Sequence, residues 1–263
     1  MFTDQKACDK VYDGHKGVRR PRLVPSAYTR QVGAIEGYNR HCIAQLISYS
    51  PRLCPFRTDK VQYNVDPAIK RQLSQIAPHI FLILNKYSTP VSKYNVICHS
   101  DCWNNNNLFK YQGGNPVDVV LVDYQLARFA SPVTDISYFL YMSANYDFLS
   151  KYYDQLLDIY YGTVAGILRE CDIDIEETFP RHILQDHLKE YSVLGLVEAL
   201  ISMKIVTAES EEAQKMLEMK HQAPNDLHEY ETQNQIMFVE RVNGIVKFFF
   251  ERNFTLDGVL IKQ

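Results

Sequence analysis

One polar stretch between two apolar runs constrains this chain more than any other feature. His99 and Asp101 follow a short apolar run, Asn106 lies five positions further along, and Asp123 directly follows the next apolar run. Residues 112–116, which read QGGNP, separate the two parts and are typical of the turn of a β-hairpin. The order predicts a polar loop, two antiparallel strands, and a carboxylate directly after the second strand.

The pairing of this hairpin determines which polar side chains face each other. If residues 113–116 form a four-residue loop, Gln112 pairs with Val117 and, further from the turn, Asn106 pairs with Asp123. Directly opposed residues of an antiparallel pair have Cα atoms about 4.5–5.5 Å apart. A bulge in one strand would shift the pairing by one residue. The predicted register therefore brings an amide and a carboxylate to one point.

These residue types suit phosphoryl transfer. Amide and carboxylate oxygens are ligands that Mg²⁺ prefers, and a site with few protein ligands suits a metal ion held partly by phosphates. Asn106 and Asp123 are therefore predicted to bind metal and nucleotide. Asp101 is the candidate for the base that accepts the proton of an attacking hydroxyl. His99 is the second catalytic candidate, although a hydrogen bond from its ring to the Asp123 backbone or a neighbouring carbonyl is its favoured role.

Purely structural roles would also account for several of these residues. Asp and Asn favour loops and turns for local reasons. Cys98, His99 and Cys102 suggest zinc, but no second pair lies at ligand spacing elsewhere in the sequence, which argues against a zinc site. Asp135 stands at a predicted helix start, where an N-cap role would account for it equally well. Trp103 is expected to pack beneath the loop as structural support.

Helical periodicity flanks the polar stretch on both sides. Apolar residues recur at steps of three and four over 35–50 and 67–87, and Pro78 is expected to kink the second of these helices. The inward side chains of that helix are predicted to be Ile69, Leu73, Ile76, Ile80, Phe81 and Leu84. Further helices are predicted at 135–143, 148–170, 180–207, 210–221 and 228–251. Four tyrosines are predicted to lie in the core: Tyr152, Tyr153, Tyr160 and Tyr161. The predicted fold class is α+β, mainly α.

Composition narrows the classes of partner. The chain has 263 residues, of which 46% are hydrophobic, so it can bury a substantial core. Its formal net charge of -3 leaves no basic excess to neutralise a nucleic-acid backbone, so a small molecule is the expected partner. The N-terminus is polar and no apolar run is long enough to span a bilayer, so we expect no membrane association and a cytoplasmic location.

Beyond the spacing, the residues themselves resemble a known family. The segments that carry the resemblance are His99-Ser100-Asp101-Cys102-Trp103 through Asn106, Val122-Asp123-Tyr124-Gln125 and Ser131-Pro132-Val133-Thr134-Asp135. They are similar to the insect ecdysteroid kinase-like (CHK kinase-like) family, whose members are relatives of the aminoglycoside and choline kinases. The similarity is dense over 96–143 and diffuse over 148–250. Ser100 stands where the family usually has glycine.

The resemblance implies a protein-kinase-like fold and an ATP-dependent phosphotransferase that acts on the hydroxyl of a small alcohol, such as an ecdysteroid. It implies Mg²⁺ and ATP as cofactors, Asp101 as the catalytic base, and Asn106 and Asp123 as the metal ligands. It also implies that Asp135 braces the catalytic loop.

The part of a kinase that holds ATP from above is not visible in the sequence. That N-terminal lobe needs about 80 residues, whereas two predicted helices already occupy much of the sequence before His99. No G-x-G-x-x-G motif occurs, and no lysine lies within an apolar strand. We therefore expect an irregular segment over 1–34 and essentially a C-terminal, helical lobe over 35–263, with its catalytic core at 96–143.

Without the other lobe, two alternatives to an active enzyme stay open. The chain could be a catalytically inactive remnant that binds a small ligand or a protein partner, or a fragment without independent stability. An apolar patch near Trp103, Leu108 and Leu126 is expected to be open to a partner or a second copy, or to be covered partly by residues 1–34.

Overall fold

The computed structural model of the protein describes residues 64–89, 93–222, 230–256 and 259. The predictions for the irregular segment 1–34 and for the helix at 35–50 lie outside these residues. The described elements, in chain order, are α3 (Pro67–Ile76), η2 (Ala77–His79), α4 (Ile80–Ser88), β1 (Val96–Cys98), η3 (Asn104–Asn106), β2 (Asn107–Gln112), β3 (Asn115–Leu121), η4 (Tyr124–Leu126), β4 (Arg128–Ala130), α5 (Pro132–Ser143), α6 (Tyr146–Glu170), α7 (Ile175–Thr178), α8 (Arg181–Val206), α9 (Ser210–Gln222) and α10 (Gln235–Glu251). The described part of the chain is mainly helical with two small antiparallel sheets, which confirms the predicted α+β, mainly α class at this level.

The first described helix is interrupted where the sequence predicted a kink. Asp66 caps α3 by accepting a hydrogen bond from the Ala68 amide at 2.7 Å, and Pro78 lies in the 3₁₀ turn between α3 and α4. This turn changes the helical phase, so Phe81 is 44% exposed and its predicted inward position is wrong. The inward face of α4 consists of Ile80, Ile83, Leu84 and Tyr87.

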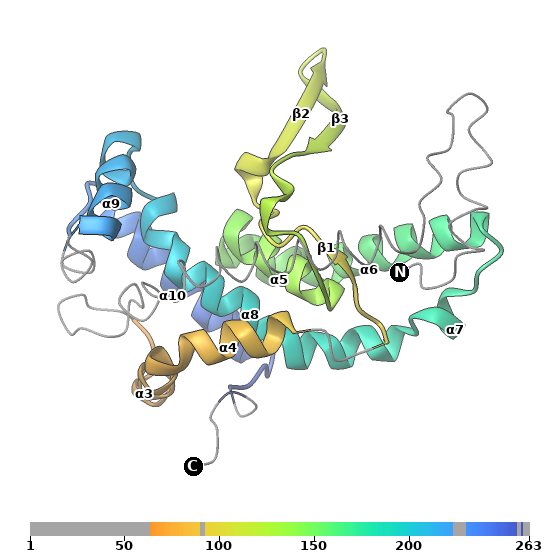
Figure 1. The fold of residues 1–263 in the computed structure, drawn as a ribbon, viewed down its shortest axis with the longest axis horizontal. Helices are drawn as coiled ribbons and strands as arrows, with labels where there is room; N and C mark the ends of the chain where they lie inside the picture. The colour runs from red at the N-terminus through yellow and green to blue at the C-terminus, as the bar shows by residue number, and fades with distance from the viewer. Residues whose placement is uncertain (1–63, 90–92, 223–229, 257–258, 260–263) are drawn as a thin grey trace.

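Helix α8 runs through the middle of the molecule and packs against α4, α5 and α10 (Figure 1). Its contact with α5 is close because Gly195 lies against Ser137, and a Cβ at Gly195 would stand 2.7 Å from the Ser137 carbonyl carbon. Of the four tyrosines predicted to lie in the core, Tyr153 on α6 is buried, with its ring 5.0 Å from that of Phe248 on α10. The other three, Tyr152, Tyr160 and Tyr161, are only partly buried. The hydrophobic core thus forms around α8.

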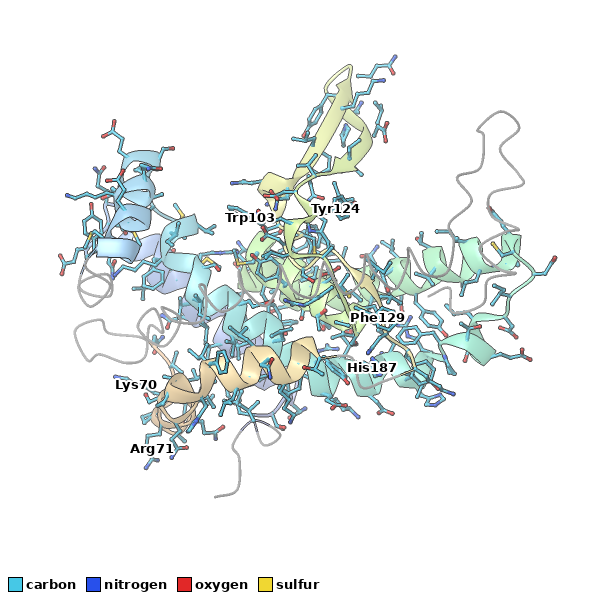
Figure 2. All side chains as sticks on the ribbon, viewed as in Figure 1. Lys70, Arg71, Trp103, Tyr124, Phe129 and His187 are labelled. Atoms are coloured by element: carbon cyan, nitrogen blue, oxygen red, sulfur yellow. The ribbon has the colours of Figure 1, made fainter. Side chains whose placement is uncertain are left out.

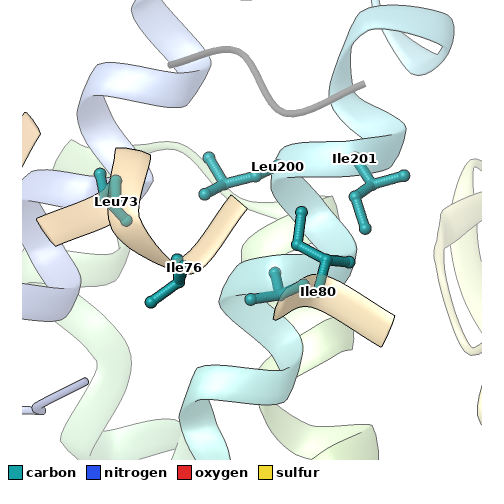
Figure 3. Close-up of a pocket in the computed structure, with 6 residues that line it drawn as sticks. Leu73, Ile76, Ile80, Leu200 and Ile201 are labelled. Carbon is teal, nitrogen blue, oxygen red and sulfur yellow. The ribbon is translucent and has the colours of Figure 1, made fainter. Parts of the chain in front are cut away.

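A small cavity lies where α3 and α4 meet α8 (Figure 3). Six apolar side chains line it: Leu73, Ile76, Ile80, Val197, Leu200 and Ile201. Its volume of about 10 Å³ is at the lower limit for one water molecule. The cavity is therefore a packing defect and not a substrate site.

The two sheets flank the polar stretch. Strand β1 pairs with β4, with Cys98 opposite Arg128, while β2 and β3 form the predicted hairpin, which stands clear of the helices (Figure 1). Gly113 and Gly114 have φ values of 58° and 82°, the backbone of a two-residue hairpin turn with positive φ at both positions. The predicted four-residue loop is therefore wrong.

This turn, together with a bulge between Lys110 and Tyr111, moves the register by one residue from the predicted one. Asn107 pairs with Leu121, and the Val122 amide donates to the Asn106 carbonyl at 3.0 Å. Asn106 consequently faces Val122, and the predicted direct pairing of Asn106 with Asp123 is wrong.

No single helix in the described ranges is long and apolar enough to cross a membrane; α8 and the first part of α9 pass that test of length and composition only as a pair, bent by 119°.

Candidate active site

Helix α5 begins just behind the polar loop, and its first turn holds the backbone of the loop. Ser131 is the N-cap, because its Oγ accepts the Val133 amide at 3.3 Å, so the N-cap role considered for Asp135 is wrong. The Asp135 carboxylate instead accepts the His99 amide at 2.6 Å and the Ser100 amide at 2.8 Å. Both residues are buried, so these two amides depend on Asp135 for hydrogen bonding.

The cap of α5 is itself tied to the central helix. Ser131 Oγ lies 2.8 Å from Nδ1 of His187, a residue of α8. The His187 ring is surrounded by the rings of Tyr94, Phe179 and Tyr191. Burial lowers the pKa of His187, so the neutral ring is favoured as the partner of the Ser131 hydroxyl. The start of α5 is therefore fixed relative to the core.

Ser100 has the backbone conformation for which glycine is best suited. Its φ is 68°, in the left-handed region, where an L-residue with a Cβ is strained. Its side chain is buried, and among the described residues its Oγ has no hydrogen-bond partner. The serine therefore keeps the loop conformation at a cost in stability.

His99 is 5% exposed, and both of its ring nitrogens are engaged with backbone groups. Nε2 lies 2.9 Å from the Val122 carbonyl oxygen, and Nδ1 accepts the Asp101 amide at 3.3 Å. The ring also packs on Tyr124, with centroids 4.4 Å apart. In this arrangement His99 joins the loop to the end of the hairpin and has no ring nitrogen facing outward for proton transfer.

The Asp101 carboxylate is held through both of its oxygens. Asn106 donates from Nδ2 to the Asp101 carbonyl at 2.8 Å and to Oδ2 at 3.1 Å, and the Tyr138 hydroxyl donates to Oδ1 at 3.1 Å. Burial raises the pKa of Asp101 and the nearby Asp123 charge adds to this, whereas the two side-chain hydrogen bonds and His99 oppose it. An oriented carboxylate with a raised pKa is a suitable proton acceptor.

Asp123 lies at the foot of the hairpin in an exposed position. Its φ is 66°, and its Oδ2 accepts a hydrogen bond from Gln125 Nε2 at 3.2 Å. Asn106 donates both of its hydrogen bonds to Asp101 through Nδ2, which leaves the amide oxygen as a possible ligand. Hard oxygen donors of this kind fit Mg²⁺ bound partly through phosphates. The described residues contain no group of three or more His, Cys, Asp or Glu side chains placed to hold a metal alone.

Trp103 and Tyr124 lie where the hairpin joins the helices (Figure 2). Trp103 is partly buried against the hydrophobic core, and its carbonyl accepts the Asn106 amide at 3.0 Å and the Asn107 side chain at 2.7 Å. Its backbone thus shapes the turn that presents Asn106.

Two features of the site were not found from the sequence. Tyr138 lies three residues after Asp135 and so on the same side of α5, a spacing that could have indicated a second contact with the loop. The other is a partly buried ion pair, in which Arg128 Nη2 lies 3.1 Å from Glu198 Oε1. Burial raises the pKa of Glu198 to about 7 despite Arg128. Their sequence separation of 70 residues left no local signal.

A comparison with models of protein families assigns the chain to one family. A model of the ecdysteroid kinase-like family matches residues 34–173, which is more than half of the chain. The chain belongs to the ecdysteroid kinase-like family, as its sequence predicted. No curated protein and no solved structure matches the chain.

Proposed function

We propose that this chain is the helical lobe of a protein-kinase-like phosphotransferase, which transfers the γ-phosphoryl group of ATP to the hydroxyl of a small cytoplasmic alcohol of the ecdysteroid type. Family membership supports a kinase-like phosphotransferase in general terms. The observation that carries the assignment to these residues is the Asp101 carboxylate, oriented on a loop that Asp135 and His99 hold in place.

In this proposal Asp101 accepts the proton of the attacking hydroxyl. Asn106 orients the carboxylate, and Asp135 keeps the backbone of His99 and Ser100 fixed, so the base need not reorganise during the reaction. The Asn106 amide oxygen and the Asp123 carboxylate would hold Mg²⁺, which would neutralise charge on the transferred phosphate.

We expect turnover to be slow. The sequence has no glycine-rich phosphate loop of the form G-x-G-x-x-G. Loss of one group that stabilises transition-state charge commonly costs about 2.7–4 kcal/mol, or about a hundred- to a thousandfold in rate. The products must therefore be followed with a sensitive method, such as transfer of radiolabelled phosphate.

The test is phosphate transfer from Mg–ATP to a panel of alcohols that includes an ecdysteroid, with Asp101→Asn as the variant. Asp118→Asn is the matched control, because Asp118 is an exposed hairpin carboxylate that accepts its neighbour Val119 amide at 2.9 Å. We expect Asp101→Asn to lose about a hundredfold or more of the rate and Asp118→Asn to retain it. Equal rates in the parent and Asp101→Asn would contradict the proposal, and nucleotide binding without any transfer would favour the inactive remnant.

A further inference from the structure

Helix α5 contacts the loop at two points one turn apart. Asp135 accepts the two backbone amides of His99 and Ser100, and Tyr138 donates to Oδ1 of the Asp101 side chain at 3.1 Å. One rigid element thereby fixes both the backbone of the loop and the direction of its carboxylate.

Tyr138 is well suited to hold a carboxylate in one orientation. Its side chain is 7% exposed and forms part of the hydrophobic core, so the ring cannot swing away from the loop. Burial raises the pKa of its phenol, with the negative charge of Asp101 as the next cause, so the hydroxyl stays protonated and remains a donor.

The two donors leave the carboxylate able to react. Tyr138 occupies Oδ1 and Asn106 occupies Oδ2, whereas an ionised carboxylate has about four acceptor positions. Asp101 is only partly buried, so a hydroxyl can still approach it. The donors set the rotamer and leave acceptor positions for a substrate proton.

We infer that Tyr138 is a positioning residue, whose hydroxyl fixes the Asp101 carboxylate in the orientation needed to take the proton from the hydroxyl of the alcohol substrate. This assignment rests on the proposed role of Asp101 as the base. Such a role predicts that the rate of transfer and the affinity for substrate respond differently to a change at Tyr138. Removal of the hydroxyl should lower the rate of transfer and leave substrate affinity nearly unchanged, because Tyr138 acts only through Asp101.

The experiment uses Tyr138→Phe, which keeps the ring and its packing, in the full chain. Tyr153→Phe is the matched control, since Tyr153 is also a buried core tyrosine and its ring packs on Phe248. We expect kcat to fall about tenfold or more in Tyr138→Phe, with KM for ATP and for the alcohol within about twofold of the parent. The control should retain the parent values of kcat and of both KM constants. A Tyr138→Phe enzyme with the parent kcat would overturn the inference.

A second measurement separates this inference from the proposed function. In protein labelled with ¹³C-aspartate, the carboxyl resonance of Asp101 is assigned with Asp101→Asn and recorded at one neutral pH. We expect Tyr138→Phe to move this resonance and Tyr153→Phe to leave it in place. An unchanged resonance in Tyr138→Phe would overturn the inference whether or not the chain transfers phosphate. If Tyr138→Phe does not unfold cooperatively on heating, Tyr138→Met removes the same donor and serves in its place.

Discussion

The hairpin and helix α5 both adjoin the polar loop that carries His99 and Asp101, but they differ in almost every physical respect. All side chains from Leu108 to Leu121 are exposed, and the Phe109, Tyr111 and Val120 side chains are 49%, 62% and 56% exposed. Eight of the twelve residues of α5 are buried. A two-stranded hairpin is marginally stable alone, so α5 and not the hairpin must fix the position of the loop.

The difference shows how the site divides its tasks. The hairpin contributes polar groups to the candidate site at its foot, where Asn106 and Asp123 lie. Helix α5 contributes Asp135 and Tyr138, which contact the loop from the side of the core. Of the three residues predicted to border an open apolar patch, Leu108 is exposed, whereas Trp103 and Leu126 are partly buried. The proposed cover of that patch, residues 1–34, lies outside the described residues. We therefore expect changes near the loop to have large effects on the α5 side and small effects along the hairpin.

The largest expected effect comes from Asp135→Ala. The change leaves the buried His99 and Ser100 amides without their acceptor, and each unsatisfied buried group costs about 1–3 kcal/mol. The free energy of unfolding, measured with urea, should fall by about 3 kcal/mol or more. Asp147→Ala on α6, where the carboxylate lies in an exposed first turn, is the control and should cost about 0.3–1 kcal/mol. Equal losses for the two variants would show that the loop does not depend on α5.

Gly195→Ala should have the next largest effect. A Cβ at this position meets the backbone of Ser137, so α5 and α8 must separate, and overpacking of this kind costs about 1–3 kcal/mol. Gly162→Ala on α6 is the matched control, because no atom lies within 4 Å of its added Cβ. That control should be neutral or more stable by up to about 1 kcal/mol, since alanine favours the helix. If both variants unfold at the same urea concentration, the close contact between α5 and α8 is not real.

Ser100→Gly should stabilise the protein slightly. The change removes the left-handed strain at φ 68°, about 1–2 kcal/mol, and a buried hydroxyl, but glycine also gives the unfolded chain more freedom, which costs about 0.4–1 kcal/mol. We expect a net gain of about 1 kcal/mol in the free energy of unfolding. A loss of stability would mean that the Ser100 side chain makes a favourable contact in solution.

The smallest effect is expected on the hairpin. Tyr111→Thr keeps a residue that favours strands at a position that is 62% exposed, and exposed substitutions of this kind usually change stability by less than about 0.5 kcal/mol. Thermal unfolding of this variant should match that of the parent. A clear drop in melting temperature would show that the hairpin face is covered, which would remove the contrast with α5.

Much of the fold could be predicted because helices leave a strong periodic signal. Helices α5, α6, α8 and α9 begin and end within a few residues of their predicted limits, whereas α10 begins at Gln235 rather than at 228. The four-residue α7 was missed, since one turn is too short for a periodic pattern.

The site was less accessible to sequence reasoning. Its loop and hairpin could be placed from the order of residues, but the register depended on the backbone of Gly113 and Gly114. The contact of Tyr138 with Asp101 spans 37 residues and forms only when α5 packs behind the loop. Local patterns therefore identified the candidate base and missed what orients it.

The proposed metal–nucleotide site can be tested most directly by titration calorimetry with Mg–ADP. We predict that the parent chain binds Mg–ADP, that Asp123→Ala abolishes binding while the fold stays intact by circular dichroism, and that Asp118→Ala binds like the parent, because its carboxylate accepts only the Val119 amide at 2.9 Å on the exposed hairpin. Equal affinity for Mg–ADP in the parent and Asp123→Ala would contradict the account.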